Sequence, residues 1–370
     1  MLILEVLFYI FIVVVIIQIV YYGFIFGNFS FSKEHSQSHK NISVSVIICA
    51  KNEAKNLKHF LPSILNQDYK NFEVVLINDN SKDKTLNVME SFKAKHDNIK
   101  IVNVKPIEAF WGNKKYALTL GIKAATNDFL LFTDADCKPV SKYWIKEMSS
   151  AFTNTKTLVL GYGAYKKKEN SFLNKLIRFE TVLTAIQYFS FAKTGMPYMA
   201  VGRNLAYRKD EFFNANGFMS HMNIRSGDDD LFINQVATSK NTTTCFSKSS
   251  FTESVPETAF NAWFKQKRRH VTTAKHYKSI HKFTLGLFYI SQIFFWILAT
   301  LLLSFLFKWE IVLGLVIARF TLQFLIYGFS AKKLNEIDTI ILLPFLELFL
   351  IVSQFFIFIS NLTSKTKHWR

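Results

Sequence analysis

Four long apolar segments constrain the fold of this chain more than any other feature of its sequence. They cover residues 2–26, 284–307, 311–330 and 339–360. A helix of about 20 apolar residues is long enough to cross the hydrocarbon core of a bilayer. The first segment lacks the basic start and the small-residue cleavage site of a signal peptide, so we interpret it as a retained anchor. The sequence therefore predicts an anchor over 1–27, up to three membrane helices over 284–361 and a basic tail over 362–370.

Composition fits a membrane protein whose soluble part is basic. Hydrophobic residues make up 50% of the 370 residues and charged residues only 19%, yet the formal net charge is +18. This apolar content excludes a disordered chain and fits an ordinary soluble enzyme poorly. The three cysteines, Cys49, Cys137 and Cys245, lie far apart and form no CxxC pair. We therefore expect neither a disulfide framework nor a zinc site, and a catalytic part in a reducing compartment.

Polar residues interrupt the third and fourth apolar segments. Arg319 lies in the third, and Pro344, Glu347 and Gln354 lie in the fourth. Because such residues are costly in contact with lipid, we expect these two segments to face each other, a pore or the soluble domain. Alternatively, one of them lies in the membrane interface instead of crossing.

The distribution of basic residues predicts the orientation in the membrane. No lysine or arginine precedes the first span, whereas Lys33 and Lys40 follow it closely. We therefore expect an outside N-terminus, a cytoplasmic middle region and a multi-pass protein of the cell membrane. Lys332 and Lys333 also fall inside. If all four segments cross, the basic tail ends outside, so either the tail breaks the positive-inside rule or one segment does not span.

Residues 41–281, between the first and second spans, have the pattern of an α/β domain. Short β-branched or aromatic runs alternate with helix-like stretches, which favours a mostly parallel sheet built of βαβ units. The expected strands are 42–49, 72–77, 101–104, 129–133 and 158–162, and the expected helices are 56–65, 84–94 and 114–125. Ligands of such sheets bind beyond the carboxyl ends of the strands. Residues 172–191 are expected to form either an amphipathic interfacial helix or a buried core helix.

Acidic residues follow three of the expected strands. They are Glu53 after the first strand, Asp79 and Asp83 after the second, and Asp134 and Asp136 after the fourth. Taken singly, each has an ordinary explanation as a turn residue or a helix-dipole partner. Asp134 and Asp136 point the same way when they leave a strand, and two converging carboxylates suit Mg²⁺ or Mn²⁺. We therefore predict a metal site at Asp134 and Asp136.

At these positions the chain resembles the family 2 glycosyltransferases, which have a GT-A fold. The matching motifs are residues 46–53 (VIICAKNE), 77–85 (INDNSKDKT), 133–137 (TDADC), 202–207 (GRNLAY), 227–230 (GDDD) and 266–269 (QKRR), with Lys114 ahead of Ala117-Leu118. The flanking spans are similar to those of the membrane-bound branch, which includes the cellulose, hyaluronan, chitin and poly-N-acetylglucosamine synthases. The resemblance implies a GT-A, Rossmann-like domain over 41–281.

The resemblance also implies a site for a nucleotide sugar, with a UDP-sugar as the expected donor. Glu53 and Asp79 would hold the nucleoside, with Asp79 at the base, and Lys114 would lie near the nucleotide. Asp134 and Asp136 would bind ribose, diphosphate and the divalent metal. Such a metal stabilises the negative charge that accumulates on the nucleoside diphosphate leaving group.

The acidic run at 227–230 is the expected source of the catalytic base. Inverting transfer needs a carboxylate that removes the proton of the acceptor hydroxyl. The family uses the second member of an acid pair, which corresponds to Asp229, and Asp228 remains a candidate because the register is uncertain by one residue. The alternative is an acidic cap at a helix N-terminus.

A basic run precedes the second span and resembles the QxxRW motif of processive family members. Gln266 and Arg269 match, and by similarity the arginine contacts the diphosphate, but His270 replaces the tryptophan that lines the acceptor site. That departure puts processive polymerisation in doubt. Read without the family, the same run is a juxtamembrane collar that meets anionic lipid. Arg203 and Asn204 either contact the acceptor or close a turn.

Two classes of function follow from these features. The first is a membrane-anchored, metal-dependent inverting glycosyltransferase acting on a lipid-linked or glycan acceptor, with a processive polysaccharide synthase as the alternative within the family. The second is a non-catalytic basic membrane protein that binds anionic ligands. Contact with membrane lipids is expected in both, and partner membrane subunits or oligomers are possible. Nucleic acid is not expected as a partner, because the basic residues are dispersed.

Overall fold

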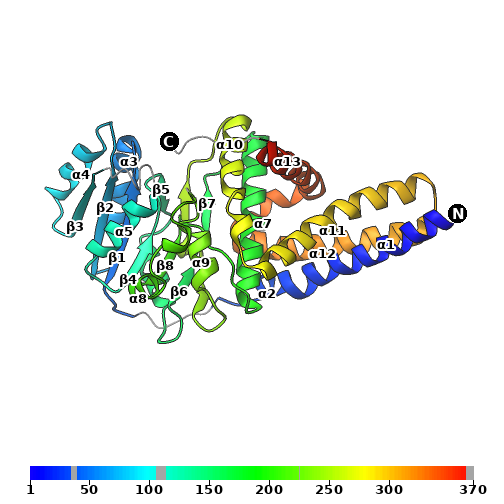
Figure 1. The fold of residues 1–370 in the computed structure, drawn as a ribbon, viewed down its shortest axis with the longest axis horizontal. Helices are drawn as coiled ribbons and strands as arrows, with labels where there is room; N and C mark the ends of the chain where they lie inside the picture. Colours follow the sequence, from blue (N-terminus) through cyan, green and yellow to red (C-terminus); the bar gives the residue numbers. More distant parts are fainter. Residues whose placement is uncertain (35–39, 106–113, 225, 364–370) are drawn as a thin grey trace.

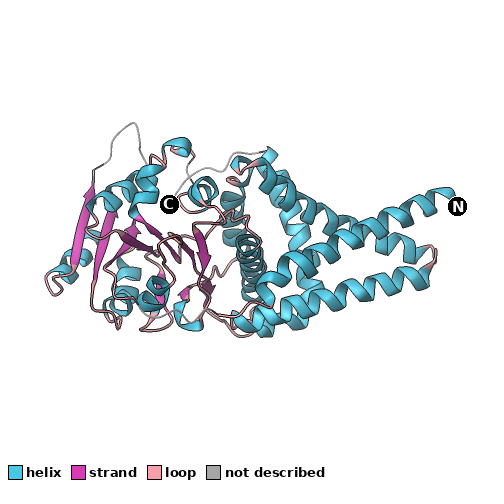
Figure 2. Cartoon of the chain, turned by 90° about the horizontal axis from the view of Figure 1, so that it is seen from below, coloured by secondary structure: helices cyan, strands magenta, loops and turns pink. Residues whose placement is uncertain are grey.

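In the computed structural model, which describes residues 1–34, 40–105, 114–224 and 226–363, a bundle of long helices projects from an α/β domain. Figure 1 shows the strands at one end and the N-terminus at the far end of the bundle. Figure 2 shows the same separation from below. The basic residues of the tail beyond position 363 lie outside the described residues.

The α/β domain is built on a seven-stranded sheet of order β3-β2-β1-β4-β8-β6-β9. Neighbouring strands from β3 to β4 run parallel, and β8 runs antiparallel to both β4 and β6. The strands are β1 (Val44–Ala50), β2 (Phe72–Asp79), β3 (Ile99–Val104), β4 (Phe129–Phe132), β6 (Leu158–Leu160), β8 (Leu205–Arg208) and β9 (Thr242–Thr244). A second sheet of order β5-β10-β7 joins β5 (Cys137–Pro139), β10 (Thr252–Ser254) and β7 (Gly163–Tyr165).

Helices cover both faces of the large sheet, which explains the nearly continuous apolar runs of its central strands. Alternate residues of β2 pack on opposite sides, with Val74 and Leu76 in one core and Val75 and Ile77 in the other. The first core includes α3 (Ala54–Leu65), α4 (Thr85–Lys93) and α6 (Trp144–Ser150), and the second includes α5 (Lys114–Ala124), α7 (Phe172–Lys193) and α9 (Asp230–Val236). Helix α8 (Lys209–Asn214) follows β8.

All five expected strands and all three expected helices are present, with small shifts at their ends. The alternation of strands with helices therefore predicted the mostly parallel sheet correctly. The fifth expected strand, β6, belongs to the antiparallel side of the sheet, where it pairs with β8. The segment 172–191 forms α7, which is buried over most of its circumference, so the core-helix alternative is confirmed.

Three long helices form the projecting bundle. Helix α1 (Leu2–Ile19) continues through a π-helical segment (Val20–Phe26) into α2 (Gly27–Ser30), and it packs on α11 (Ser279–Ser304) and α12 (Trp309–Lys333). Helix α7 runs across the base of this bundle (Figure 1). These three helices and α13 (Leu343–Thr363) are long and apolar enough to cross a membrane, as expected, which indicates membrane association.

Helix α13 does not continue the bundle along its length. It packs on α7 and on α10 (Phe260–Val271), beside the α/β domain (Figure 1). At its C-terminal end, the Arg268 guanidinium of α10 donates to Asn361 Oδ1 over 3.0 Å and to the Ser360 carbonyl over 2.7 Å. The start of the segment 337–363 is held as well, by Arg178 of α7. Both ends of this segment are therefore fixed to helices of the α/β domain.

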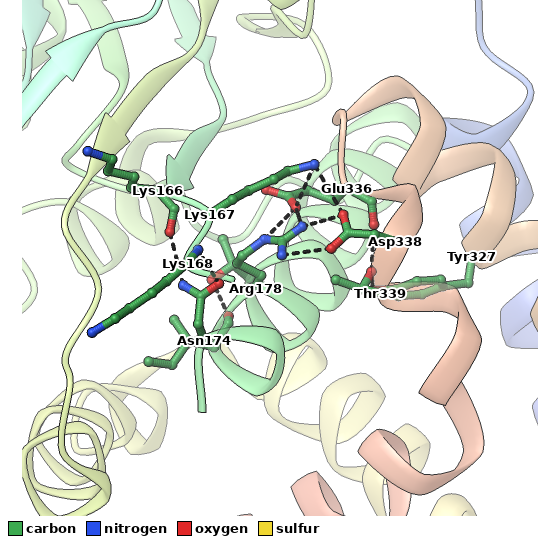
Figure 3. A network of polar contacts seen from close by, with 11 residues as sticks. Lys166, Lys167, Lys168, Asn174, Arg178, Tyr327, Glu336, Asp338 and Thr339 are labelled. Atoms are coloured by element: carbon green, nitrogen blue, oxygen red, sulfur yellow. Dashed lines mark hydrogen bonds and ion pairs between the residues drawn. The ribbon is translucent and has the colours of Figure 1, made fainter. Parts of the chain in front are cut away.

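Arg178 holds the start of that segment in an ion-pair network (Figure 3). Its Nε lies 2.7 Å from Glu336 Oε2, and its Nη1 lies 2.8 Å from Asp338 Oδ2. Lys167 joins the same cluster 3.1 Å from Asp338. The Tyr327 hydroxyl of α12 lies 2.8 Å from Thr339 Oγ1, which ties the network to the bundle.

A second network joins the bundle to α13. Arg319 of α12 lies 2.5 Å from Glu347 of α13, and both side chains are buried. Gln292 of α11 donates to the same carboxylate over 2.9 Å, and Gln18 of α1 accepts from Arg319 over 3.1 Å. The expectation that the polar residues of the third and fourth apolar segments face each other is therefore confirmed for Arg319 and Glu347.

Candidate active site

A cleft of about 560 Å³ opens where the carboxyl ends of β1, β2 and β4 meet the helices α7 and α10. This volume is in the usual range for a site that binds a small molecule. The nine residues predicted for nucleotide, metal and base all line it: Glu53, Asp79, Lys114, Asp134, Asp136, Asp228, Asp229, Gln266 and Arg269. The structure thus brings together residues that are spread over more than 200 positions, although their individual roles stay predictions.

The turns after β1 and β2 form one side of the cleft. Asn52 and Asn80 both have positive φ angles, of 58° and 49°, a conformation that asparagine tolerates better than most residues. The Asn52 side chain accepts from the Lys82 backbone N–H over 2.8 Å, which ties the two turns together. Asp83 accepts from the backbone N–H groups of Ala54 and Thr85, so this carboxylate supports the turns and does not line the cleft.

Asp79 ends β2 and forms an ion pair that the sequence did not predict. Its Oδ2 atom lies 3.5 Å from Lys51 Nζ, which follows β1. Glu53 faces the same cleft, and burial, together with the nearby Asp136, raises the pKa of its carboxyl group. The Lys51 ammonium group and the carboxyl groups of Glu53 and Asp79 therefore lie at the ends of two neighbouring parallel strands.

Asp134 and Asp136 follow β4 and converge as expected. Their carboxylate oxygens and the Cys137 sulfur lie within 4.8 Å of one another. Burial and the neighbouring Asp134 raise the pKa of the Asp136 carboxyl, as expected for two acids that repel each other. Burial also raises the pKa of the Cys137 thiol, and sulfur is a soft donor that hard divalent cations do not favour. The remaining oxygen donors fit a hard divalent cation such as Mg²⁺ or Mn²⁺.

Lys114, the first residue of α5, connects the two acidic clusters. Its ammonium group lies 3.0 Å from Asp134 Oδ1 and 2.9 Å from Asp228 Oδ2. Burial opposes the charged form of this lysine, but the two carboxylates outweigh burial and raise its pKa. The lysine therefore stays protonated and offers a fixed positive charge in the centre of the cleft.

The three acids at the start of α9 have three different environments. Burial opposes the charge of Asp228, but the ion pair with Lys114 outweighs it and lowers the pKa. Asp229 accepts the Gly202 N–H over 2.6 Å, yet burial and the charges of Asp228 and Asp230 raise its pKa to about 7. Asp230 accepts from the Tyr277 hydroxyl over 2.7 Å and from the Thr273 hydroxyl. The Asp229 carboxylate also accepts the Asp230 N–H over 2.8 Å, so it caps α9, as the alternative reading of this run expected. Of the three acids, only Asp229 lines the cleft with hydrogen bonds to backbone N–H groups alone and has a pKa near neutrality.

Helix α10 lines the side of the cleft that faces α7. Gln266, Lys267, Arg269 and His270 border the cleft, and Lys267 pairs with Glu180 of α7 over 2.8 Å. The basic run is therefore more than a collar that meets lipid, because it forms a wall of the cleft. Whether Gln266 and Arg269 contact a donor diphosphate stays a prediction.

Arg203 and Asn204 have separate tasks. Asn204 is buried and bonds to the Tyr162 and Ser250 carbonyls, so it supports the fold. Arg203 borders the cleft, donates to the Ser254 hydroxyl over 2.7 Å and lies 4.2 Å from the centre of the Tyr165 ring. Lys51 and Lys267 also line the cleft, although the expected site did not include them. Lys51 lies in the 46–53 motif, directly after a strand.

Comparison with known protein families identifies the family to which the chain belongs. Residues 45–219 match the model described as Glycosyl transferase family 2, and residues 141–356, more than half of the chain, match Glycosyl transferase family group 2. The chain belongs to the family 2 glycosyltransferases. Members of this family are enzymes, which argues against the non-catalytic alternative.

Several curated glycosyltransferases match parts of the chain. The 4,4'-diaponeurosporenoate glycosyltransferase of Staphylococcus haemolyticus is 26% identical over 180 residues, which are 47% of this chain and 46% of that protein. The poly-beta-1,6-N-acetyl-D-glucosamine synthase of Staphylococcus epidermidis is 32% identical over 123 residues, which are 33% of this chain and 29% of that protein. The chain thus matches less than half of the length of these relatives.

One solved structure resembles nearly the whole chain. It is the mannosyltransferase PcManGT from Pyrobaculum calidifontis in complex with GDP-Man and Mn²⁺, which aligns with a TM-score of 0.60 and 15% sequence identity. The alignment covers 93% of this chain and 99% of that chain. At this identity the likeness establishes the fold: the glycosyltransferase has the GT-A-like architecture with its attached helices.

Proposed function

We propose that this glycosyltransferase is a membrane-anchored, inverting enzyme that transfers one sugar from a nucleotide sugar, with a UDP-sugar as the expected donor, to a membrane-associated or glycan acceptor. Catalysis depends on Mg²⁺ or Mn²⁺ and takes place at the cytoplasmic face of the cell membrane. The observation that carries the proposal is the carboxylate of Asp229, with a pKa near 7, in the same cleft as the acidic pair Asp134 and Asp136.

On the donor side, each group has a chemical task. Glu53 and Asp79 hold the nucleoside at the ends of β1 and β2, and Asp134 and Asp136 hold the divalent cation. The bound cation neutralises charge on the diphosphate of the donor. Lys114 and Arg269 add positive charge along the cleft, where a leaving diphosphate gains negative charge as the bond to the sugar breaks.

On the acceptor side, Asp229 acts as the general base. It takes the proton of the acceptor hydroxyl while the hydroxyl oxygen bonds to the anomeric carbon and the nucleoside diphosphate leaves. A base with a pKa near the working pH combines a useful ionised fraction with a strong pull on the proton. Asp228 is a weaker candidate, because its carboxylate is held by Lys114 over 2.9 Å.

A processive synthase is the second candidate within the family, and two observations weigh against it. His270 stands where the processive motif has tryptophan, so the aromatic platform for the growing chain is altered at this position. Helix α13 lies against α7 and α10, so within the described residues three helices form the bundle. A bundle of three helices is small for a polymer channel within one chain.

A screen of nucleotide sugars tests the proposal. The purified protein in nanodiscs made with lipids from its native membrane is incubated with each nucleotide sugar, and release of nucleoside diphosphate is measured. We expect turnover of at least one donor with Mn²⁺ or Mg²⁺ and loss of turnover with a chelator. Turnover that persists in the chelator would contradict the role given to the cation. Long labelled products would favour the processive alternative.

A further inference from the structure

A second cavity, of about 180 Å³, lies between α7, α11 and α13. We call it the membrane-side cavity. It shares three lining residues with the active-site cleft, namely Gln187, Tyr198 and Gln354. The two spaces therefore adjoin at these side chains. A molecule whose hydroxyl reaches Asp229 can extend from the cleft toward the bundle along this route.

The junction residues have polar groups without partners in the protein. Among the described residues, no hydrogen bond is made by the side-chain amides of Gln187 and Gln354 or by the Tyr198 hydroxyl. Deeper in the cavity, by contrast, Gln292 donates to Glu347 over 2.9 Å. Unpaired polar groups next to apolar helices are costly, and they mark substrate paths when they face a cavity.

Helix α7 extends the polar surface back toward the catalytic centre. Glu180, Thr181, Thr184 and Gln187 lie at helical spacing and all line the cleft, whereas most of the remaining surface of α7 is apolar and buried. The polar stripe therefore runs along one helix from the ion pair with Lys267 to the junction. Amides and hydroxyls both donate and accept hydrogen bonds, which suits ligands rich in hydroxyl groups.

The charge of the membrane-side cavity separates two kinds of ligand. No lysine, arginine or histidine is among its lining residues in the part of the chain that the structure describes. Its one charged residue is Glu347, whose carboxylate is paired with Arg319. A phosphate group placed here would lose its hydration without gaining a cation, and it would approach a carboxylate. A neutral, hydroxylated group has no such cost.

We propose that the membrane-side cavity is a subsite for a neutral sugar of the acceptor, bound by Gln187, Gln354 and Tyr198. This inference rests on the proposed function and specifies its acceptor as a glycoside. The apolar residues around the cavity, such as Leu183, Phe288 and Leu350, suit an acceptor that also carries a lipid chain. The enzyme thus extends a glycolipid that already holds a sugar.

Octyl glycosides and octyl phosphate test the subsite, because they share one apolar chain and differ in the head group. Binding of radiolabelled octyl glucoside, galactoside, N-acetylglucosaminide and phosphate to the protein in nanodiscs is measured by equilibrium dialysis, with empty nanodiscs as background. We expect saturable binding of at least one glycoside. Octyl phosphate can bind at the basic wall of the cleft, which includes Lys267 and Arg269, so any binding of it should not depend on Gln187 and Gln354. Replacing both amides, in Gln187→Leu/Gln354→Leu, raises the Kd of that glycoside about tenfold or more.

Gln235→Leu is the matched control, because it makes the same change at an exposed position of α9, and it leaves the glycoside Kd unchanged. Absence of glycoside binding, a glycoside Kd that the double variant leaves unchanged, or a Kd of octyl phosphate that the double variant raises as much as that of the glycoside would overturn the inference. Nucleoside diphosphate binding in Mn²⁺ is measured on the same samples. If the double variant alone loses nucleoside diphosphate binding, it has misfolded. The glycoside Kd is then measured in Gln187→Asn and Gln354→Asn, which shorten each amide, and a rise in that Kd is expected. If the wild type does not bind the nucleoside diphosphate, the proposed function is contradicted instead.

Discussion

At the scale of single residues, three consecutive aspartates illustrate how environment assigns different roles to one residue type. Asp228 is paired with Lys114, Asp230 is held by Thr273 and Tyr277, and Asp229 keeps a carboxylate that faces the cleft. The sequence could predict that this run carries the base but could not fix its register. The partners that separate the three acids come from α5 and from the segment after α10, far away in the chain.

The raised pKa of Asp229 predicts how the reaction depends on pH. A general base acts in its ionised form, so kcat/KM should rise about tenfold per pH unit well below a pKa of about 7 and level off above it. Asp228→Asn removes a neighbouring negative charge that raises this pKa, so its profile should shift toward lower pH. The measurement is kcat/KM for the donor found by the screen, between pH 5 and 9. A flat profile in the wild type would contradict the assignment.

Replacement of Asp136 tests the metal site separately from the base. Asp136→Asn removes one of the two converging carboxylates, so the Kd of the nucleoside diphosphate in Mn²⁺ should rise about tenfold or more, as calorimetry would show. Asp97→Asn is the matched control, because Asp97 is exposed, precedes β3 and does not line the cleft. Equal affinity in the wild type and in Asp136→Asn would exclude Asp136 as a ligand.

At the scale of elements, the strands could be predicted from the sequence, whereas the packing of the fourth apolar segment could not. Both faces of β1 and β2 are buried, which produces continuous apolar runs ending in polar turns that are visible in sequence. The segment 339–360 is as apolar as a spanning helix, and hydropathy does not reveal what it packs against. Its position depends on tertiary contacts of Arg178 and Arg268, two residues that the sequence analysis did not connect to it.

The buried pair Arg319 and Glu347 should couple α12 to α13. Removing one partner, in Arg319→Leu or Glu347→Leu, leaves a buried charge without its counter-charge and should destabilise the protein by about 3–5 kcal/mol. The double variant removes both charges, so it should lose less stability than the two single variants together. Thermal unfolding in detergent gives the comparison through Tm. Strictly additive losses would show that the pair is not coupled.

At the scale of the whole molecule, the position of α13 offers a solution to the conflict in the distribution of charge. If α1, α11 and α12 cross the membrane and α13 stays at the interface beside α7 and α10, the chain crosses three times. The C-terminal end then lies on the same side as the catalytic domain. Both the catalytic domain and the basic tail are in that case inside, as the positive-inside rule prefers.

Labelling of single introduced cysteines tests this topology. Lys308→Cys lies between α11 and α12, Lys93→Cys lies on α4, and Thr363→Cys lies at the end of α13, and all three positions are exposed. In intact cells, a membrane-impermeant maleimide should label only Lys308→Cys. After permeabilisation it should label all three above the background of the native cysteines. Labelling of Thr363→Cys in intact cells would show that α13 crosses the membrane.

We propose that Asp229 removes the proton of the acceptor hydroxyl in a cleft that binds the donor without help from this residue. Asp229→Asn keeps the size of the side chain and its bond to the Gly202 N–H but removes the base. Single-turnover sugar transfer, measured together with the Kd of the nucleoside diphosphate in Mn²⁺, tests this most directly. We expect the rate to fall about 100- to 10,000-fold while the Kd stays within about twofold of the wild type. A rate near that of the wild type would contradict the account.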